Sequence, residues 1–78
     1  MISSKQVKAA RILLGWKGED LAKNSGIGIA TLRRYESQDG LLKGNNVLIK
    51  AIKDCLEEAN IVFTGDPETN PGVAIKKS

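Results

Sequence analysis

The sequence predicts a mainly α-helical domain, with four short helices followed by a C-terminal β-hairpin. Apolar residues recur at intervals of three and four through most of the first 60 positions, the spacing of helices that bury one face. After Asn60 the period changes, and the β-branched and aromatic run at positions 61–64 is typical of a strand. A chain of 78 residues suits one modest core, so we expect residues 1–78 to form a single domain.

The first predicted helix covers residues 4–14. Ser3 or Ser4 can cap its start with a side-chain hydroxyl, and Gly15 can end it. Three apolar residues at helical spacing form its inward stripe, namely Val7, Ala10 and Leu14.

Further apolar residues accompany this helix. Ala9 and Leu13 lie on an adjoining face, so we expect another surface to cover that face. Trp16 is the only tryptophan, and we expect it to fill the core rather than to stack on a ligand.

Two short helices, residues 18–24 and 28–37, follow with a glycine turn between them. Glu19 and Asp20 suit the positive end of the first helix dipole, and Gly26 can supply the positive φ that a sharp turn needs. The apolar residues that face inward are Leu21, Ala22, Ile27, Leu32 and Tyr35. This arrangement predicts a helix-turn-helix motif, which points to DNA binding.

The fourth predicted helix covers residues 45–60. A loop at positions 38–44 precedes it, and Leu41 or Leu42 is expected to fold back onto the core. Asn45 or Asn46 can cap the helix. Its apolar face comprises Leu48, Ala51, Ile52, Cys55, Leu56 and Ala59.

Two strands, residues 61–65 and 72–77, should pair as an antiparallel hairpin, with Val73 and Ile75 on one side. A lone hairpin is marginally stable in water. It must therefore pack on the helices or pair its edge with another chain. The free strand edge and the apolar face of Ala9 and Leu13 together predict a homodimer, with this hairpin as its candidate interface.

Composition excludes most enzymatic chemistry. There is no histidine and one cysteine, so His- or Cys-based nucleophile pairs, zinc sites and internal disulfides are not expected. The adjacent carboxylates Glu19–Asp20 and Glu57–Glu58 point apart on helices and read as exposed surface. We expect no enzyme activity, cofactor or metal. With neither a signal peptide nor a membrane span expected, the lone cysteine favours the cytoplasm.

Charge is distributed unevenly along the chain. Twelve Lys and Arg face nine Asp and Glu, a net charge of +3. Basic residues load the first segment and the second motif helix, where Arg33 and Arg34 stand together, whereas Asp54, Glu57 and Glu58 gather in the fourth helix. This asymmetry favours a nucleic-acid partner.

The segment from Val7 to Glu36 resembles the XRE-type (Cro/repressor-like) helix-turn-helix domains of bacteria and phages. The resemblance rests on five motifs in order: Ala10-Arg11, Leu14-Gly15-Trp16, Glu19-Asp20-Leu21-Ala22, Ser25-Gly26-Ile27, and Ala30-Thr31-Leu32 with Tyr35-Glu36. It implies a structural ion pair between Arg11 and Glu36. It also implies that the third helix reads double-stranded DNA in the major groove.

The resemblance, together with the hypothesis of a DNA-binding regulator, gives three groups of candidate DNA-contacting residues. The third helix supplies Gly28, Ile29, Ala30, Thr31, Arg33 and Arg34. Lys17 and Gly18 stand at the start of the second helix, and Ser37, Lys43 and Asn45 would contact backbone phosphates at the rim. Gly28 and Ile29 depart from the family pattern, because neither can form bidentate bonds to a base. Gly18 departs as well, since the family often has Gln there and Gly can offer only its N–H to the DNA backbone.

These departures leave two hypotheses. In the first, the protein is a sequence-specific transcriptional regulator that binds a palindromic or paired site as a dimer. In the second, the helix-turn-helix fold is a protein-interaction module, antitoxin-like or a phage accessory protein, with weak or no base reading.

Overall fold

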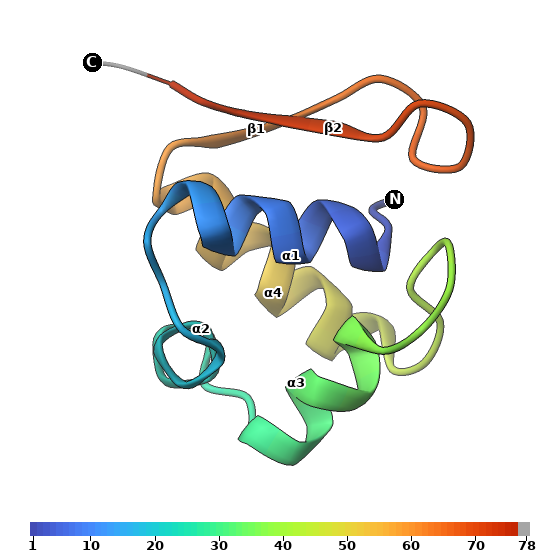
Figure 1. The fold of residues 1–78 in the computed structure, drawn as a ribbon. Coiled ribbons are helices and arrows are strands. Elements are labelled where there is room, and N and C mark those ends of the chain that lie inside the picture. The colour runs from blue at the N-terminus through green and yellow to red at the C-terminus, as the bar shows by residue number, and fades with distance from the viewer. Residues whose placement is uncertain (77–78) are drawn as a thin grey trace.

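The computed structural model describes residues 1–76 and arranges them in three layers (Figure 1). The elements in chain order are α1 (Ser4–Leu13), α2 (Gly18–Ser25), α3 (Ile29–Glu36), α4 (Asn46–Glu58), β1 (Ile61–Thr64) and β2 (Gly72–Ile75). The hairpin of β1 and β2 lies on α1 and α4, and α2 and α3 lie on the other side of these two helices. The mainly α-helical class with a C-terminal hairpin, predicted from the sequence, is confirmed.

Three of the four helices are shorter than expected because cap residues stand outside them, whereas α2 runs to Ser25, one residue beyond its predicted end. Leu14 caps the end of α1, and Gly28 and Ser37 flank α3. The largest difference is at α4, which ends at Glu58 rather than residue 60 because Asn60 turns the chain with φ of +75°. The hairpin strands are likewise shorter than 61–65 and 72–77, and position 77 lies outside the described residues.

Local capping explains where the helices begin and turn. Ser3 caps α1, its hydroxyl accepting from the Gln6 N–H at 3.2 Å while Gln6 Oε1 accepts from the Ser3 N–H at 2.9 Å. Asn45 caps α4, because its side-chain oxygen accepts from the Val47 N–H at 2.8 Å. Gly26 ends α2 in the left-handed conformation, with φ of +76°, and this produces the turn between α2 and α3.

The core lies where the helices meet beneath the hairpin. Its fully buried apolar residues come from the segment before α1, from every helix and from β1: Ile2, Val7, Ala10, Leu21, Leu32, Ile52, Leu56 and Ile61. Of the two loop leucines, Leu42 is buried and Leu41 is half-buried. Trp16 is half-buried against the core rather than enclosed by it.

The hairpin is antiparallel, with Ile61 opposite Ile75 and Phe63 opposite Val73. Residues that face each other across a ladder share one face of the sheet, so these four side chains point the same way. Ile61 is buried, but Ile75 remains 42% exposed. The helices therefore cover one end of this face only in part.

Gln6 joins the hairpin to α1. Its side chain is 2% exposed, and its Nε2 donates to the carbonyl of Thr64 at 3.3 Å and of Gly72 at 3.0 Å. These two carbonyls belong to a directly opposed pair of the ladder. One buried amide thus holds both strands over α1.

Candidate nucleic-acid interface

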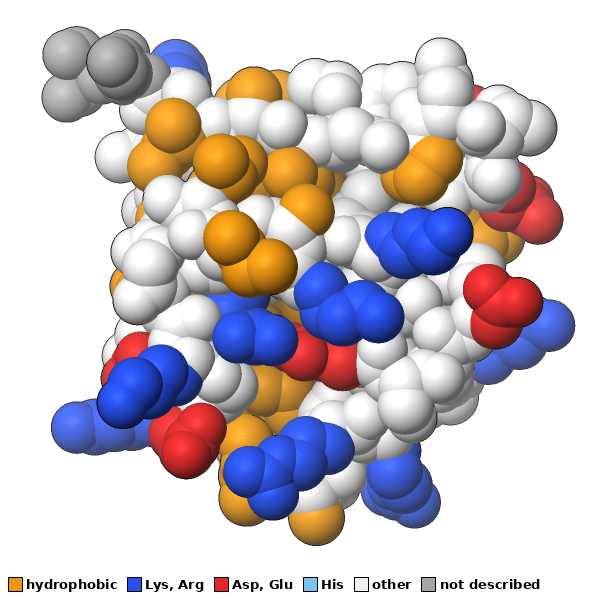
Figure 2. Space-filling model, viewed as in Figure 1, with side chains coloured by type: hydrophobic (Ala, Val, Ile, Leu, Met, Phe, Trp, Pro, Cys, Tyr) orange, Lys and Arg blue, Asp and Glu red, His pale blue; other side chains and the backbone are white. Residues whose placement is uncertain are grey.

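The outward face of α3 consists of Ala30, Arg33, Arg34 and Ser37, all exposed. Their spacing of three, four and seven places them on one side of the helix. Leu32 and Tyr35, on the opposite side, are buried and fix this orientation. The helix lies in the layer farthest from the hairpin, and basic side chains stand out along that end of the molecule (Figures 1 and 2).

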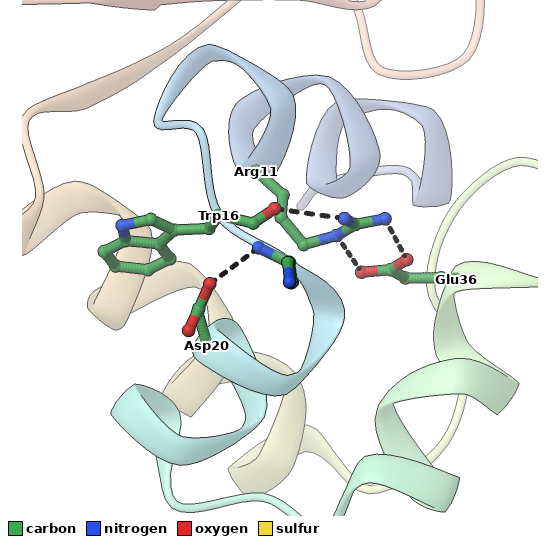
Figure 3. A network of polar contacts seen from close by, with 5 residues as sticks. Arg11, Trp16, Asp20 and Glu36 are labelled. Carbon is green, nitrogen blue, oxygen red and sulfur yellow. Dashed lines mark hydrogen bonds and ion pairs between the residues drawn. The ribbon is translucent and has the colours of Figure 1, made fainter.

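An ion pair between Arg11 and Glu36 fixes α3 relative to α1 (Figure 3). Arg11 Nε and Nη2 each donate to one Glu36 carboxylate oxygen at 3.0 Å, a bidentate geometry. Arg11 Nη1 also donates to the Trp16 carbonyl at 3.1 Å. The pair bridges the end of α1, the following turn and the end of α3. It occupies both residues, so neither is available to DNA.

The start of α2 lies beside the start of α3. The Lys17 N–H donates to Asp20 Oδ2 at 2.8 Å, and this bond closes the first turn of α2 (Figure 3). Lys17 itself is exposed. A Cβ on Gly18 would lie 3.6 Å from Ile29 Cδ1, in ordinary van der Waals contact.

Ile29 is placed differently from the rest of the predicted α3 set. Its side chain is half-buried and packs on the core, close to Gly18. Gly28 is exposed and has open space where a side chain would begin. The exposed start of α3 therefore presents backbone and the methyl group of Ala30, and its long polar side chains come from Arg33 and Arg34.

A hollow of about 350 Å³ lies between α3 and the start of α4. Its lining residues are Thr31, Arg34, Tyr35, Gln38, Lys43, Gly44, Asn45 and Leu48. Two of these carry positive charge and none carries negative charge. Arg34 Nη2 also lies 3.5 Å from Thr31 Oγ1, so this arginine leans toward the hollow. The combination of cations and polar donors suits a phosphate group.

Polar contacts hold the loop between α3 and α4 in place. The Gln38 side chain bonds to both backbone groups of Lys43, at 2.8 Å to its N–H and 2.7 Å to its carbonyl. The Tyr35 hydroxyl accepts from the Asn45 N–H at 3.1 Å. Gly44, with φ of +142°, leaves room for this tyrosine, because a Cβ there would approach its hydroxyl to 2.8 Å.

The structure thus divides the predicted DNA-contacting residues into neighbouring groups. Ala30, Arg33, Arg34 and Ser37 share the outward face of α3, while Thr31, Lys43 and Asn45 join Arg34 around the hollow. Lys17 and Gly18 lie at the start of α2, where Gly18 is next to Ile29 of α3. Gln38 was not among the predicted site residues. It lies in a loop, where no periodic pattern indicates its role, and that role depends on its contacts with the backbone of Lys43 five residues away.

The described residues offer little other chemistry. Within residues 1–76 no group of three or more Cys, Asp or Glu side chains could hold a metal ion. Burial, with a smaller effect from Glu58, raises the pKa of the Cys55 thiol, which makes this residue a poor nucleophile. No helix in the described part of the chain is long and apolar enough to cross a membrane.

Comparison with known proteins agrees with this geometry. A family model described as Helix-turn-helix, HTH_3, matches residues 7–48, more than half of the chain. The matched range runs from α1 to the start of α4 and so includes α2, α3 and the hollow. No curated protein matches the sequence.

Proposed function

Because this chain belongs to the HTH_3 family of XRE-type helix-turn-helix domains, we propose that it is a sequence-specific transcriptional regulator that lays α3 in the major groove of DNA. The observation that carries this proposal is the outward face of α3. This face has two arginines, nothing within residues 1–76 covers it, and the Arg11–Glu36 pair joins α3 to α1. The family suggests DNA binding in general, and sequence-specific reading is our inference.

We assign the residues two kinds of role. Arg33 and Arg34 supply contacts to base edges and phosphates, and the methyl group of Ala30 meets thymine methyl groups. Lys43 and Asn45, with Thr31, hold a backbone phosphate in the hollow. Lys17, Gly18 and Ser37 contact the backbone at the edges of the interface, with Gly18 offering only its N–H. We assign Ile29 to the packing of α3 on the core more than to contacts with bases.

The same proposal includes the protein's partners and setting. We expect a homodimer joined through the hairpin, a non-enzymatic role, and action in the cytoplasm of a bacterium or on behalf of a phage. The homodimer is inferred from the free edge of the hairpin and from the exposed apolar side chains at the end of α1, Ile12 and Leu13.

The test is a salt titration of binding to duplex DNA of random sequence, from low to moderate salt. Each phosphate contact adds roughly 0.9 to the magnitude of the log–log slope. The double variant Arg33→Ala/Arg34→Ala should bind at least tenfold more weakly at low salt and lose up to about 1.8 of slope if both contact phosphates. The matched control is Lys5→Ala/Lys8→Ala, which removes two positive charges from α1 instead of α3.

Either of two results would refute the proposal. If the wild-type protein does not bind DNA even at low salt, or if the α3 and α1 variants weaken binding equally, α3 is not the DNA-contacting element. The second hypothesis, a protein-interaction module, would then be favoured. The observation that supports it is that Gly28 and Ala30 offer no bidentate hydrogen bonds at the exposed start of α3.

A further inference from the structure

We propose that Ser4, at the start of α1, is a positioning residue that holds the loop of residues 38–44 in the shape that brings Lys43 to the hollow. Ser4 is not among the residues that line the hollow. It acts through the backbone of Gln38, whose side chain continues the connection to Lys43. This inference rests on the proposed function, in which Lys43 helps to hold a backbone phosphate of DNA.

The Ser4 hydroxyl is available for this role because the neighbouring serine caps α1. The Ser3 hydroxyl accepts from the Gln6 N–H, so the capping box is complete without Ser4. Ser4 is only 1% exposed, and its Oγ donates to the Gln38 carbonyl at 2.5 Å. Burying a hydroxyl is unfavourable unless it forms a hydrogen bond. The Gln38 carbonyl satisfies this hydroxyl and is thereby fixed relative to α1.

Backbone contacts extend the attachment along the loop. The Ser4 N–H donates to the Gly40 carbonyl at 3.0 Å. The Leu42 N–H donates to the Ile2 carbonyl at the same distance. Between these two bonds, Leu41 forms an isolated antiparallel bridge with the segment before α1. The loop is thus paired with that segment along one side, and Leu42 is buried in the core.

The Gln38 side chain connects this attachment to the hollow. It bonds to both the N–H and the carbonyl of Lys43, at 2.8 and 2.7 Å. The residue that holds the Lys43 backbone is therefore the same one whose carbonyl is bound to Ser4. Lys43 is exposed and lines the hollow together with Arg34, whereas Ser4 is buried. Ser4 can influence the hollow only through the loop.

Holding the loop in place would strengthen phosphate binding without a direct contact to DNA. A loop that is ordered before binding loses less conformational entropy when it binds, so preorganisation raises affinity. Lysine is a point charge on a flexible stem, and the position of its backbone determines which phosphate it can reach. At the far end of the loop, the Tyr35 hydroxyl already fixes the Asn45 N–H. Ser4 supplies the corresponding fixed point at the start of the loop.

A double-mutant cycle on binding to duplex DNA of random sequence tests the proposal. Ser4→Ala should weaken binding at low salt by roughly three- to tenfold, because the loop must then be ordered on binding. It should also lower the magnitude of the salt slope by up to about 0.9, although Ser4 carries no charge. In a Lys43→Ala background, Ser4→Ala should weaken binding by less than about 1.5-fold, because the contact that it positions is already absent.

The matched control is Ser25→Ala. The Ser25 hydroxyl also donates to a backbone carbonyl, that of Leu21 at 2.6 Å, but it lies at the end of α2. Its removal should change DNA binding by less than about twofold. Thermal unfolding of each variant establishes that it is folded at the temperature of the binding measurement.

Hydrogen exchange of the free protein tests the attachment without DNA. In Ser4→Ala the amides of Leu42 and Lys43 should lose protection by about threefold or more, while the amide of Ile49, in α4, should not change. Gln38→Ala breaks the connection at its second step. It should lower the protection of the Lys43 amide and leave that of Leu42 unchanged.

Two results would overturn the proposal. Unchanged protection of Leu42 and Lys43 in Ser4→Ala would show that Ser4 does not hold the loop. Additive losses in the binding cycle would show that Ser4 does not act through Lys43. If the wild type does not bind DNA at all, the regulator is refuted, whereas the amide protection still decides whether Ser4 holds the loop.

Discussion

Gln6 allows a sharp test of how the hairpin is held on the helices. The variant Gln6→Glu keeps the side-chain shape and the oxygen that accepts from the Ser3 N–H, so the cap of α1 is preserved. It replaces the donor Nε2 with a carboxylate oxygen that faces the carbonyls of Thr64 and Gly72. Only the contact with the hairpin changes.

The expected loss of stability is large for a domain of this size. Each of the two lost hydrogen bonds removes about 1 kcal/mol, and an ionised oxygen that faces two part-buried carbonyl oxygens adds about one more, which gives about 3 kcal/mol at pH 7. Total stability for 78 residues is roughly 4–12 kcal/mol. The unfolding midpoint should therefore fall by roughly 12–24 °C.

The loss should depend on pH in a defined direction. Burial against carbonyl groups raises the pKa of the introduced carboxyl group above its unfolded value of about 4.3. Below that value both states carry the proton, and the neutral acid can donate one of the two bonds, so the penalty is small. The penalty grows as pH rises from about 4.3 to the raised pKa and is then constant.

Urea unfolding followed by circular dichroism at pH 4 and pH 7 measures both effects, each relative to the wild type at the same pH. The control is Gln6→Met, which removes the two bonds to the hairpin and also the acceptor for the Ser3 N–H, without adding a titrating group. The loss of stability in Gln6→Glu should grow between pH 4 and pH 7, whereas the loss in Gln6→Met should be the same at both pH values. Equal, pH-independent losses in the two variants would show that the Gln6 amide does not hold the strands.

Three further outcomes follow from the structure. Arg11→Ala should lower the free energy of unfolding by about 2–3 kcal/mol. This is less than the cost of breaking a fully buried ion pair, because the side chains of Arg11 and Glu36 are 21% and 13% exposed. A loss under about 0.5 kcal/mol in urea unfolding would contradict this prediction. Gly28→Ser should raise stability by about 0.5–1 kcal/mol, since position 28 begins α3 with φ of −62° and open space for a capping hydroxyl; the same change at Gly26, with φ of +76°, should destabilise. Cys55 should react with iodoacetamide more slowly in the folded chain than in urea at pH 8, because burial raises the pKa of its thiol and lowers the thiolate fraction; equal rates would refute this explanation.

The sequence predicted the helical part of the fold well, because its signals are local. The glycine between α2 and α3 has the left-handed φ that the turn required, and Leu21, Leu32 and Tyr35 are buried as their spacing indicated. The contacts of Gln6 could not be predicted in the same way, since they join residues 58 and 66 positions apart. A polar residue in a helix gives no sign in the sequence that it is buried.

The candidate site shows the same division between local and distant determinants. Arg33 and Arg34 were recognised from their residue type, and helical spacing places them on the exposed face. The inward position of Ile29 depends on its packing against the core beside the start of α2, a contact between segments that helical spacing does not specify. The hollow beside Arg34 depends on the path of a loop, which periodicity does not specify.

The layered arrangement has a consequence for how such a protein can change during evolution. The hairpin rests on α1 and α4, and the exposed face of α3 lies beyond them, so few substitutions affect both surfaces. In the proposed regulator, mutations in the hairpin would change how two copies assemble, while mutations on α3 would change what each copy recognises. Selection could then adjust the spacing between two half-sites and the sequence of each half-site independently.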